Sequence, residues 1–398
     1  MDSNSQPDLR NAGTTSTAEI TEPTPRASLA EVAALFLRLG FTAFGGPAAH
    51  IAMMEHEVVV RRKWLTHGRF LDLLGAANLI PGPSSTEMAL YIGYTQAGWL
   101  GIMLGGVCFI LPAALMTLVL AWAYVRFGRL PQIGGILYGV KPVVIAIVAQ
   151  AIWKLGRTAI KSRLYALVGL AALAVAATTG WTISLLLGTG ILMCIALGFK
   201  TKRTPAVSVA LPSKAVWTLP AAAVAAVSLT SLFLVFLKIG AVVFGSGYVL
   251  LAFLKSELVD QRHWLTNAQL LDAVAVGQVT PGPVFTTATF IGYVLAGLPG
   301  AALATTAIFL PGFLLVAASG PLVPRLRRSA MAGHFLDGVN LAALALMTVV
   351  TWQLGRASIC DVPTAALVIV SAVLLLRFRV NSFWLIAMGA VAGLLLRR

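Results

Sequence analysis

The chain has little charge and few cysteines. Only 11% of its 398 residues are charged, whereas about 25% are charged in soluble globular domains. The three cysteines, Cys108, Cys194 and Cys360, lie far apart and form no CxxC pair. Neither a disulfide framework nor a structural zinc site is therefore expected. The five histidines are scattered, and we predict no metal and no cofactor.

The chain also lacks the motifs of common enzymes. It contains no HExxH, no GxSxG and no closely spaced acidic pair of the DxxxD type, so we predict that it is not an enzyme. The phosphate-binding pattern GxxxxGK[ST] is missing as well. Without it, the sequence offers no basis for an ATP-driven pump.

Apolar residues dominate instead. They make up 58% of the chain, and the mean hydropathy is +0.88. Apolar runs recur at the length of about 20 residues that a membrane-spanning helix needs, and they do not alternate as β-barrel strands do. The sequence predicts an all-α, multi-pass membrane protein with about 10–13 spans. The expected helices cover about 28–44, 66–80, 85–103, 105–125, 134–153, 164–179, 181–198, 219–244, 363–377 and 382–396.

The formal net charge is +15, from 29 Lys and Arg against 14 Asp and Glu. The basic residues stand in short clusters between apolar runs, which is typical of loops that orient helices in a bilayer. We therefore expect contact with lipid and none with nucleic acid. Residues 1–27 are polar and lack the apolar core of a signal peptide, so we interpret them as a disordered cytoplasmic tail.

Two copies of one pattern organise the rest of the chain. Each copy contains a Gly-rich break, the triplet Trp-Leu-Thr, the triplet Pro-Gly-Pro and then Ile-Gly-Tyr. The copies are offset by 200 residues up to Pro-Gly-Pro and by 199 afterwards. We predict a first transmembrane repeat at 28–198, a linker at 199–216 and a second repeat at 217–398.

Internal repeats with broken helices at matching positions are typical of secondary transporters, whose sites lie between the repeats. A duplicated membrane scaffold or sensor without a transported solute is the alternative. The relative orientation of the halves stays open. Segment 55–70 is basic whereas 255–263 is balanced, which favours inverted repeats, but both halves have a basic turn at the later equivalent position. A homodimeric assembly is also left open.

The breaks themselves are candidate binding elements for an anion. A proline suits the first turn of a helix, so each Pro-Gly-Pro predicts a helix N-terminus at membrane depth, where free N–H groups and the helix dipole favour an anion. A pair of structural kinks is the alternative. The candidate residues are Gly45, Gly46, Pro47, Pro81, Gly82, Pro83, Ser84, Ser85 and Thr86 in the first half, and Gly245, Ser246, Gly247, Pro281, Gly282, Pro283, Thr286 and Thr287 in the second.

Two cations occupy the same position of the two repeats. Arg38 and Lys238 both lie inside apolar helices, where a charge costs about 2.5–3.5 kcal/mol even on the lenient insertion scale. Together they predict a two-cation site for a small dianion. The alternative is that each cation pairs with an acid, Asp72 or Asp272, or extends to the membrane surface.

The copies also differ at a few positions. Lys141, a third candidate cation, corresponds to Asn340, a further candidate ligand. Glu87 follows the first Pro-Gly-Pro, whereas we match it with Thr287 in the second copy. A lone buried carboxyl beside an anion site suits a proton carrier, so Glu87 is the first candidate for proton coupling. Two further acids, Asp72 and Asp272, are the other candidates.

These motifs resemble the chromate ion transporter family in its long, two-domain form. The similarity covers about residues 29–396 and is carried by segments 44–51, 81–87 and 92–94 in the first half and 240–248 and 280–284 in the second. The resemblance implies a plasma-membrane protein that exports chromate, a tetrahedral dianion like sulfate, and so gives chromate resistance. It also implies an export powered by the proton-motive force and two repeats of opposite orientation.

We therefore interpret the chain as a secondary active chromate exporter of the bacterial inner membrane, with chromate and protons as its ligands. A transporter of sulfate or another oxyanion is the first alternative, because sulfate shares the charge and shape of chromate. A non-transporting scaffold or sensor is the second.

Overall fold

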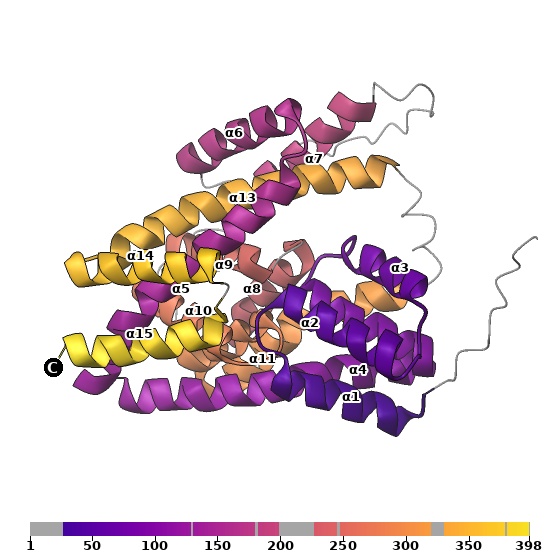
Figure 1. Cartoon of the computed structure of the whole chain (residues 1–398), viewed down its shortest axis with the longest axis horizontal. Helices are drawn as coiled ribbons and strands as arrows, with labels where there is room; N and C mark the ends of the chain where they lie inside the picture. Colours follow the sequence, from indigo (N-terminus) through magenta and orange to yellow (C-terminus); the bar gives the residue numbers. More distant parts are fainter. Residues whose placement is uncertain are drawn as a thin grey trace, which may run out of the picture.

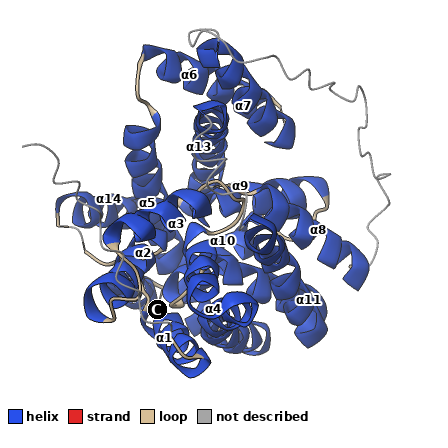
Figure 2. Cartoon of the chain, turned by 90° about the vertical axis from the view of Figure 1, so that its right-hand side faces the viewer, coloured by secondary structure: helices blue, strands red, loops and turns tan. Residues whose placement is uncertain are grey.

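The computed structural model describes residues 27–128, 130–179, 182–198, 227–244, 247–319, 330–378 and 380–397. All regular structure in these residues is helical (Figure 2). The first repeat contains α1 (Leu29–Thr42), α2 (Pro47–Glu55), the π-helical η1 (His56–Arg61), α3 (His67–Ala77), α4 (Ser84–Phe127), α5 (Pro131–Ala159), α6 (Arg163–Thr178) and α7 (Thr182–Gly198). The second contains α8 (Leu229–Val242), η2 (Gly247–Val249), α9 (Leu250–Leu254), η3 (Lys255–Gln261), α10 (Asn267–Val279), η4 (Val284–Thr286), α11 (Thr287–Ser319), α13 (Ala330–Ser358), α14 (Val362–Arg377) and α15 (Ser382–Leu396).

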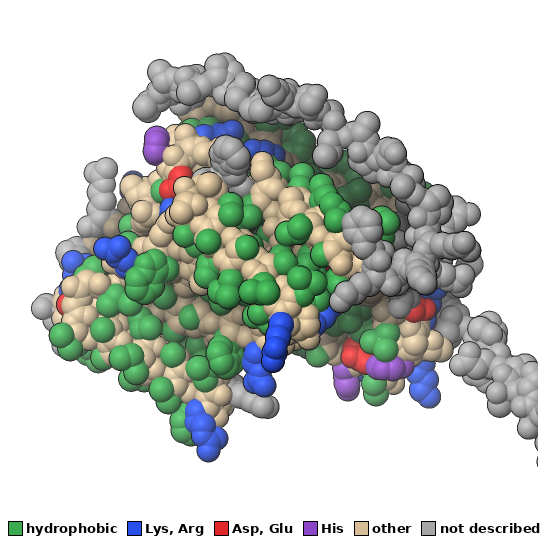
Figure 3. Space-filling model, turned by 90° about the horizontal axis from the view of Figure 1, so that it is seen from above, with side chains coloured by type: hydrophobic (Ala, Val, Ile, Leu, Met, Phe, Trp, Pro, Cys, Tyr) green, Lys and Arg blue, Asp and Glu red, His purple; other side chains and the backbone are tan. Residues whose placement is uncertain are grey.

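The predicted all-α membrane fold is confirmed. Among the described residues, four helical segments are long and apolar enough to cross a membrane: Ser84–Phe127, Gln132–Ala159, Val284–Ser319 and Met331–Ser358. The shorter apolar helices include α6, α7, α8, α14 and α15. Apolar side chains spread over the face seen in Figure 3, with Lys and Arg in small groups. An exposed apolar surface of this extent fits lipid contact.

The two longest helices each fold back on themselves. Helix α4 has non-helical backbone at Ala97 and Gly98, and α11 has it at Ala296 and Gly297. A Cβ on Gly93 would overlap the carbonyl of Gly101, so the two limbs of α4 touch on either side of the bend. The prediction of two spans at 85–103 and 105–125 is therefore wrong in its boundaries. A half-length limb at 84–96 precedes a full-length limb at 99–127.

The helix boundaries reflect local capping. Ser28 caps α1 in a box with Glu31, and Thr266 caps α10 in a box with Gln269, as their spacing predicts. The helix expected at 66–80 ends earlier, at Ala77. The helix expected at 219–244 is described only as α8. Its first part, like most of the 199–216 linker, lies outside the described residues, and the division into domains stays a prediction.

The repeats are inverted relative to one another. Helices α5 and α13 are repeat equivalents and pack together. A Cβ on Gly156 would lie 3.6 Å from Leu344, and one on Gly355 would lie 3.6 Å from Ile145. From Ile145 to Gly156 in α5 the contacts move back from Gly355 to Leu344 in α13, so the two helices run antiparallel. A two-fold axis that relates antiparallel equivalents is perpendicular to the helices, which places the repeats upside down relative to one another in a membrane.

The repeats are also interlocked. In the first repeat, α5 packs on α15 of the second, and Gly139 and Gly389 make the close contact. In the second, α13 packs on α7 of the first through Gly338 and Thr189. Small residues allow such close approach between membrane helices. Each repeat therefore completes the core of the other (Figure 1).

Two ends of the bundle are used below as reference. The N-terminal face is the end where the backbone N–H of Ala27 donates to Gln96 and Gln96 donates to the carbonyl of Trp64. The C-terminal face is the opposite end, where Tyr138 donates to Asp361 and Arg397 lies over the Tyr138 ring. In Figure 1, α1 begins at the right of the view and α15 ends at the left.

Candidate functional site

The two Pro-Gly-Pro breaks each bond to the opposite repeat. The N–H of Gly82 donates to the carbonyl of Val243 at 2.7 Å, and the N–H of Gly282 donates to that of Ala43 at 2.8 Å. Both glycines have left-handed backbone, with φ of 131° and 86°, which explains the residue type at each turn. The break after α3 therefore bonds to the end of α8, and the break after α10 bonds to the end of α1.

The two Gly-rich breaks lie at the same place. A Cβ on Gly46 would be 3.4 Å from the hydroxyl of Tyr248, and one on Gly247 would be 3.9 Å from Pro47 Cγ and 3.6 Å from Val284 Cβ. Gly245 and Ser246 lie outside the described residues. The structure thus brings together the four breaks that the sequence singled out, which we call the central break cluster. It comprises Ala43–Pro47, Pro81–Pro83, Val243–Phe244 with Gly247–Tyr248, and Pro281–Pro283.

The first turn of α4 carries buried polar groups into this cluster. Ser84, Ser85, Thr86 and Glu87 are all buried. Within the described residues, no hydrogen-bond partner is found for Ser85 Oγ, Thr86 Oγ1 or Glu87 Oε2. The Glu87 side chain packs against Gly82 of its own repeat and Gly312 of the other. Unpartnered buried polar atoms are costly, so this turn is suited to a polar ligand.

The second copy of this turn is paired differently. Thr286 and Thr287 are fully buried, but their hydroxyls donate to the carbonyls of Pro283 and Val284. Thr117 of α4 donates to Thr286 at 3.4 Å. The missing residue shortens this turn to the 3₁₀ segment η4. Since Gly93 corresponds to Gly292, Thr286 rather than Thr287 occupies the place of Glu87, which corrects our match.

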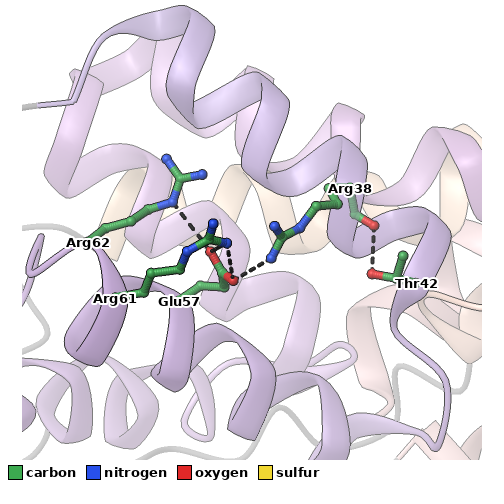
Figure 4. Close-up of polar contacts among 5 residues, drawn as sticks. All are labelled: Arg38, Thr42, Glu57, Arg61 and Arg62. Carbon is green, nitrogen blue, oxygen red and sulfur yellow. Dashed lines mark hydrogen bonds and ion pairs between the residues drawn. The ribbon is translucent and has the colours of Figure 1, made fainter.

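The paired cations bind glutamates. Arg38 is ion-paired with Glu57, which also accepts from Arg61 at 3.1 Å and contacts Arg62 at 3.4 Å (Figure 4). In the second repeat, Lys238 pairs with Glu257 at 2.6 Å, and Arg262 pairs with the same carboxylate at 2.5 Å. The alternative of pairing with Asp72 and Asp272 is wrong for both cations.

The glutamates are buried, whereas Arg38 and Lys238 have about half of their side chains exposed, 49% and 44%. The segment η1 lies outside the helices long enough to span a membrane. Burial alone would raise the pKa of Glu57. The hydrogen bonds and charges of Arg61 and Arg38 outweigh this effect and hold that pKa below its ordinary value. Glu57 is therefore an ionised carboxylate near neutral pH.

Lys141 is the one predicted cation that joins the two repeats. Its Nζ lies 3.1 Å from Asp272 Oδ1, and Tyr124 donates to Asp272 Oδ2 at 2.9 Å. Asp272 is buried. The equivalent of Lys141, Asn340, is exposed on α13, and Asp72 is half-buried on α3. The mismatch between Lys141 and Asn340 therefore coincides with a difference in packing.

Sequence reasoning missed the glutamates that hold the cations. Glu57 and Glu257 are 200 residues apart, the same offset as Arg38 and Lys238, so the repeat register could have identified them. Tyr124 gave no such signal, because its equivalent position carries valine. Among the described residues, no group of three His, Cys, Asp or Glu side chains could hold a metal ion.

An apolar bundle of two inverted repeats, with broken helices meeting at its centre, is an architecture of secondary transporters. The family model described as Chromate transporter matches residues 30–199 and 230–394, and the chain belongs to this family.

Several curated relatives carry the same description. The chain is 36% identical to the Chromate transport protein of Cupriavidus metallidurans over 98% of this chain and 97% of the relative. It is 34% identical to the Probable chromate transport protein of Synechococcus elongatus, over 85% and 88%. For the Chromate transport protein of Pseudomonas aeruginosa the identity is 30%, over 85% and 84%. No solved structure matches the chain.

Proposed function

We propose that this chain exports chromate from the cytoplasm across the inner membrane by secondary active transport, and so gives chromate resistance. The observation that carries this proposal is the central break cluster. It joins both inverted repeats and holds buried polar atoms without partners in the first turn of α4. A site shared by the two repeats can be exposed to one side of the membrane and then to the other.

In this proposal, chromate binds at the first turns that follow the two Pro-Gly-Pro breaks. The N–H groups of a first helical turn and the helix dipole favour an anion. Ser85 and Thr86 supply hydroxyl donors from one side. On the other side, the hydroxyls of Thr286 and Thr287 would turn from the carbonyls of Pro283 and Val284 toward the bound anion. A tetrahedral dianion has oxygens directed to several sides at once, which suits donors from two helix ends.

Glu87 is the proposed proton carrier. An ionised carboxylate without a partner is costly in an apolar interior, so the neutral acid suits the surroundings described here. In the proposed exchange, the proton on Glu87 and the dianion occupy the same small region in turn, so that protons move inward as chromate moves outward. Asp272 is already neutralised by Lys141, and Asp72 lies away from the cluster on α3, so we rank both below Glu87.

The export direction is supported by charge. Because the repeats are inverted, equivalent turns lie on opposite faces. Segment 55–69 on the N-terminal face has four Lys and Arg, and its equivalent 255–269 has two. Segment 157–163 has three, and its equivalent 356–362 has one. This excess of positive charge indicates that the N-terminal face lies in the cytoplasm. There the positive charge attracts chromate.

Flux in vesicles tests this function. Purified protein would be reconstituted into liposomes, and the movement of radiolabelled chromate and sulfate measured with a pH gradient imposed in either direction. We expect chromate to accumulate against its gradient only when protons move the opposite way. Inverted membrane vesicles from expressing cells should take up chromate when energised.

Three other outcomes would contradict parts of the proposal. Equal flux of sulfate and chromate would make the chain a general oxyanion transporter. Flux that ignores the pH gradient would remove the proton from the mechanism. No flux of either anion, with protein confirmed in the vesicles, would favour a scaffold or sensor.

A further inference from the structure

The Glu57 cluster carries more positive charge than its carboxylate balances. We define this cluster as Arg38 on α1, Glu57 and Arg61 on η1, and Arg62 just after η1. Figure 4 shows the three guanidinium groups pointing toward one carboxylate from two elements. Three positive charges against one negative charge leave a net charge of +2.

A pocket lies beside this excess charge. It has a volume of about 280 Å³ and is lined by Arg38, Leu39, Thr42, Ala52, Met53, His56 and Glu57. At about 30 Å³ per water in the liquid, that is room for about nine waters. The pocket can therefore admit a tetrahedral oxyanion together with part of its hydration shell. It lies beside η1, which contributes His56 and Glu57 to its lining.

The second repeat does not have the same balance. Among the described residues, Glu257 is paired with Lys238 and Arg262, and the place of Arg61 is taken by Gln261. Lys255 is bound to Asp260 instead. The equivalent cluster thus has a net charge of +1, so a dianion is neutralised by only one of the two clusters.

From this asymmetry we propose that the Glu57 cluster is the capture site for the oxyanion on the N-terminal face, and that Glu57 is a resident anion that the oxyanion displaces. The inference rests on the proposed function. Guanidinium groups bind carboxylates and tetrahedral oxyanions through the same pairs of N–H donors, so the incoming dianion takes over donors of Arg38 and Arg61. Glu57 loses these donors but keeps its pairing with Arg62, so it stays in the cluster and the two charges of the oxyanion equal the excess of +2, whereas a monoanion leaves the site charged. In the empty site Glu57 holds the arginines in place, and it stays ionised because they lower its pKa.

The test is the concentration dependence of chromate uptake into inverted membrane vesicles, which expose the N-terminal face. Arg61→Gln gives this cluster the net charge of its equivalent in the second repeat. Losing one charge-assisted hydrogen bond should raise the apparent KM for chromate about 10-fold with little change in the maximal rate. Glu57→Gln removes the competing anion and should lower the apparent KM. Arg69→Gln removes an exposed charge from the same face outside the cluster and serves as the matched control, with a KM within about 2-fold of the wild type.

The amount of each variant in the membrane would be measured alongside. Should Glu57→Gln fail to fold, Arg61→Gln still decides the question, because 57% of the Arg61 side chain is exposed. A wild-type KM in Arg61→Gln, or an equal rise in Arg61→Gln and Arg69→Gln, would overturn the capture site. If the wild-type vesicles take up no chromate, the proposed function has failed instead. If the wild-type vesicles take up chromate and the variants have the wild-type KM, only this inference is refuted.

Discussion

Helices α3 and α10 have the same place in the two repeats but different surroundings. Leu71 on α3 is 45% exposed, and its equivalent Leu271 on α10 is 1% exposed. Helix α10 packs against α5, and the Asp272 carboxylate binds Lys141 there. Helix α3 packs mainly on α4, and Asn340 stays exposed. Helix α10 of the second repeat is thus docked on α5 of the first repeat, whereas α3 has no such ion pair with α13 among the described residues.

This difference gives the two faces of the bundle different packing. The repeats are inverted, so α3 lies toward the N-terminal face and α10 toward the C-terminal face. In the proposed function, inverted repeats exchange their conformations during alternating access, and α10 would leave Lys141 in that exchange. Each prediction below tests one difference or one similarity between the repeats.

The largest effect is expected at the mismatch between Glu87 and Thr286. Glu87→Gln removes the proposed proton carrier and keeps its size, so pH-driven chromate flux should fall at least ~100-fold. Exchange of labelled for unlabelled chromate without a pH gradient should continue. Glu55→Gln, which removes a carboxylate that pairs with His67 outside the cluster, is the control. Similar pH-driven flux in both variants would exclude Glu87 as the carrier.

The ion pair that docks α10 on α5 predicts a large effect on stability. Lys141→Met leaves the Asp272 carboxylate buried without its cation, which should lower the free energy of unfolding by about 3–5 kcal/mol. Asn340→Ala in the other repeat should cost less than about 0.5 kcal/mol, because Asn340 is exposed. Thermal unfolding of the two variants in detergent, followed by intrinsic fluorescence, measures this difference. Equal melting temperatures would contradict the docking role of the pair.

The hairpin bends predict an effect that is equal in both repeats. A Cβ on Gly93 or Gly292 would overlap the carbonyl of the facing limb, whereas one on Gly98 or Gly297 would meet nothing within 4 Å. Gly93→Ala should therefore destabilise by about 3 kcal/mol. Gly98→Ala should cost about 1 kcal/mol, from its positive φ alone. The same ranking is expected for Gly292 and Gly297. A reversed ranking in either repeat would mean that the limbs do not touch there.

The smallest effect concerns the helix caps. Ser28 and Ser228 both cap the first helix of a repeat, but only Ser28 has the partner Glu31 of a full capping box. Ser28→Ala should cost about 1 kcal/mol, and Ser228→Ala about half of that. Chemical unfolding of the two variants would show the ordering. A greater loss in Ser228→Ala would contradict it.

Local features of the fold were predictable from the sequence, and its long-range features were not. Short sequence patterns indicate the capping box at Ser28, the repeat register and the four breaks. The bend at Ala97 was missed because no proline marks it, although the Ala-Gly pair recurs at 296–297. The interlocking of α5 with α15 depends on contacts between distant glycines, which leave no local periodicity.

In the candidate site, too, local features were predictable from the sequence and long-range contacts were not. The sequence placed Ser85, Thr86 and Glu87 beside a break, and the structure places these residues together at the centre. The partners of Arg38 and Lys141 follow from tertiary packing, since several acids were available to each cation. The pairing of Lys141 with Asp272 crosses between repeats, which no spacing along the chain could indicate.

Equilibrium binding of radiolabelled chromate to the purified protein tests the central claim most directly, because it needs neither a gradient nor a direction. The claim is that both repeats supply ligands to one oxyanion site. Thr86→Val and Thr286→Val each remove a buried hydroxyl at nearly constant volume, and Thr189→Val does so in α7, where the hydroxyl donates to the Leu185 carbonyl. The account predicts that the first two variants each bind chromate about 10-fold more weakly and that the third binds like the wild type. Wild-type affinity in both Thr86→Val and Thr286→Val would contradict it.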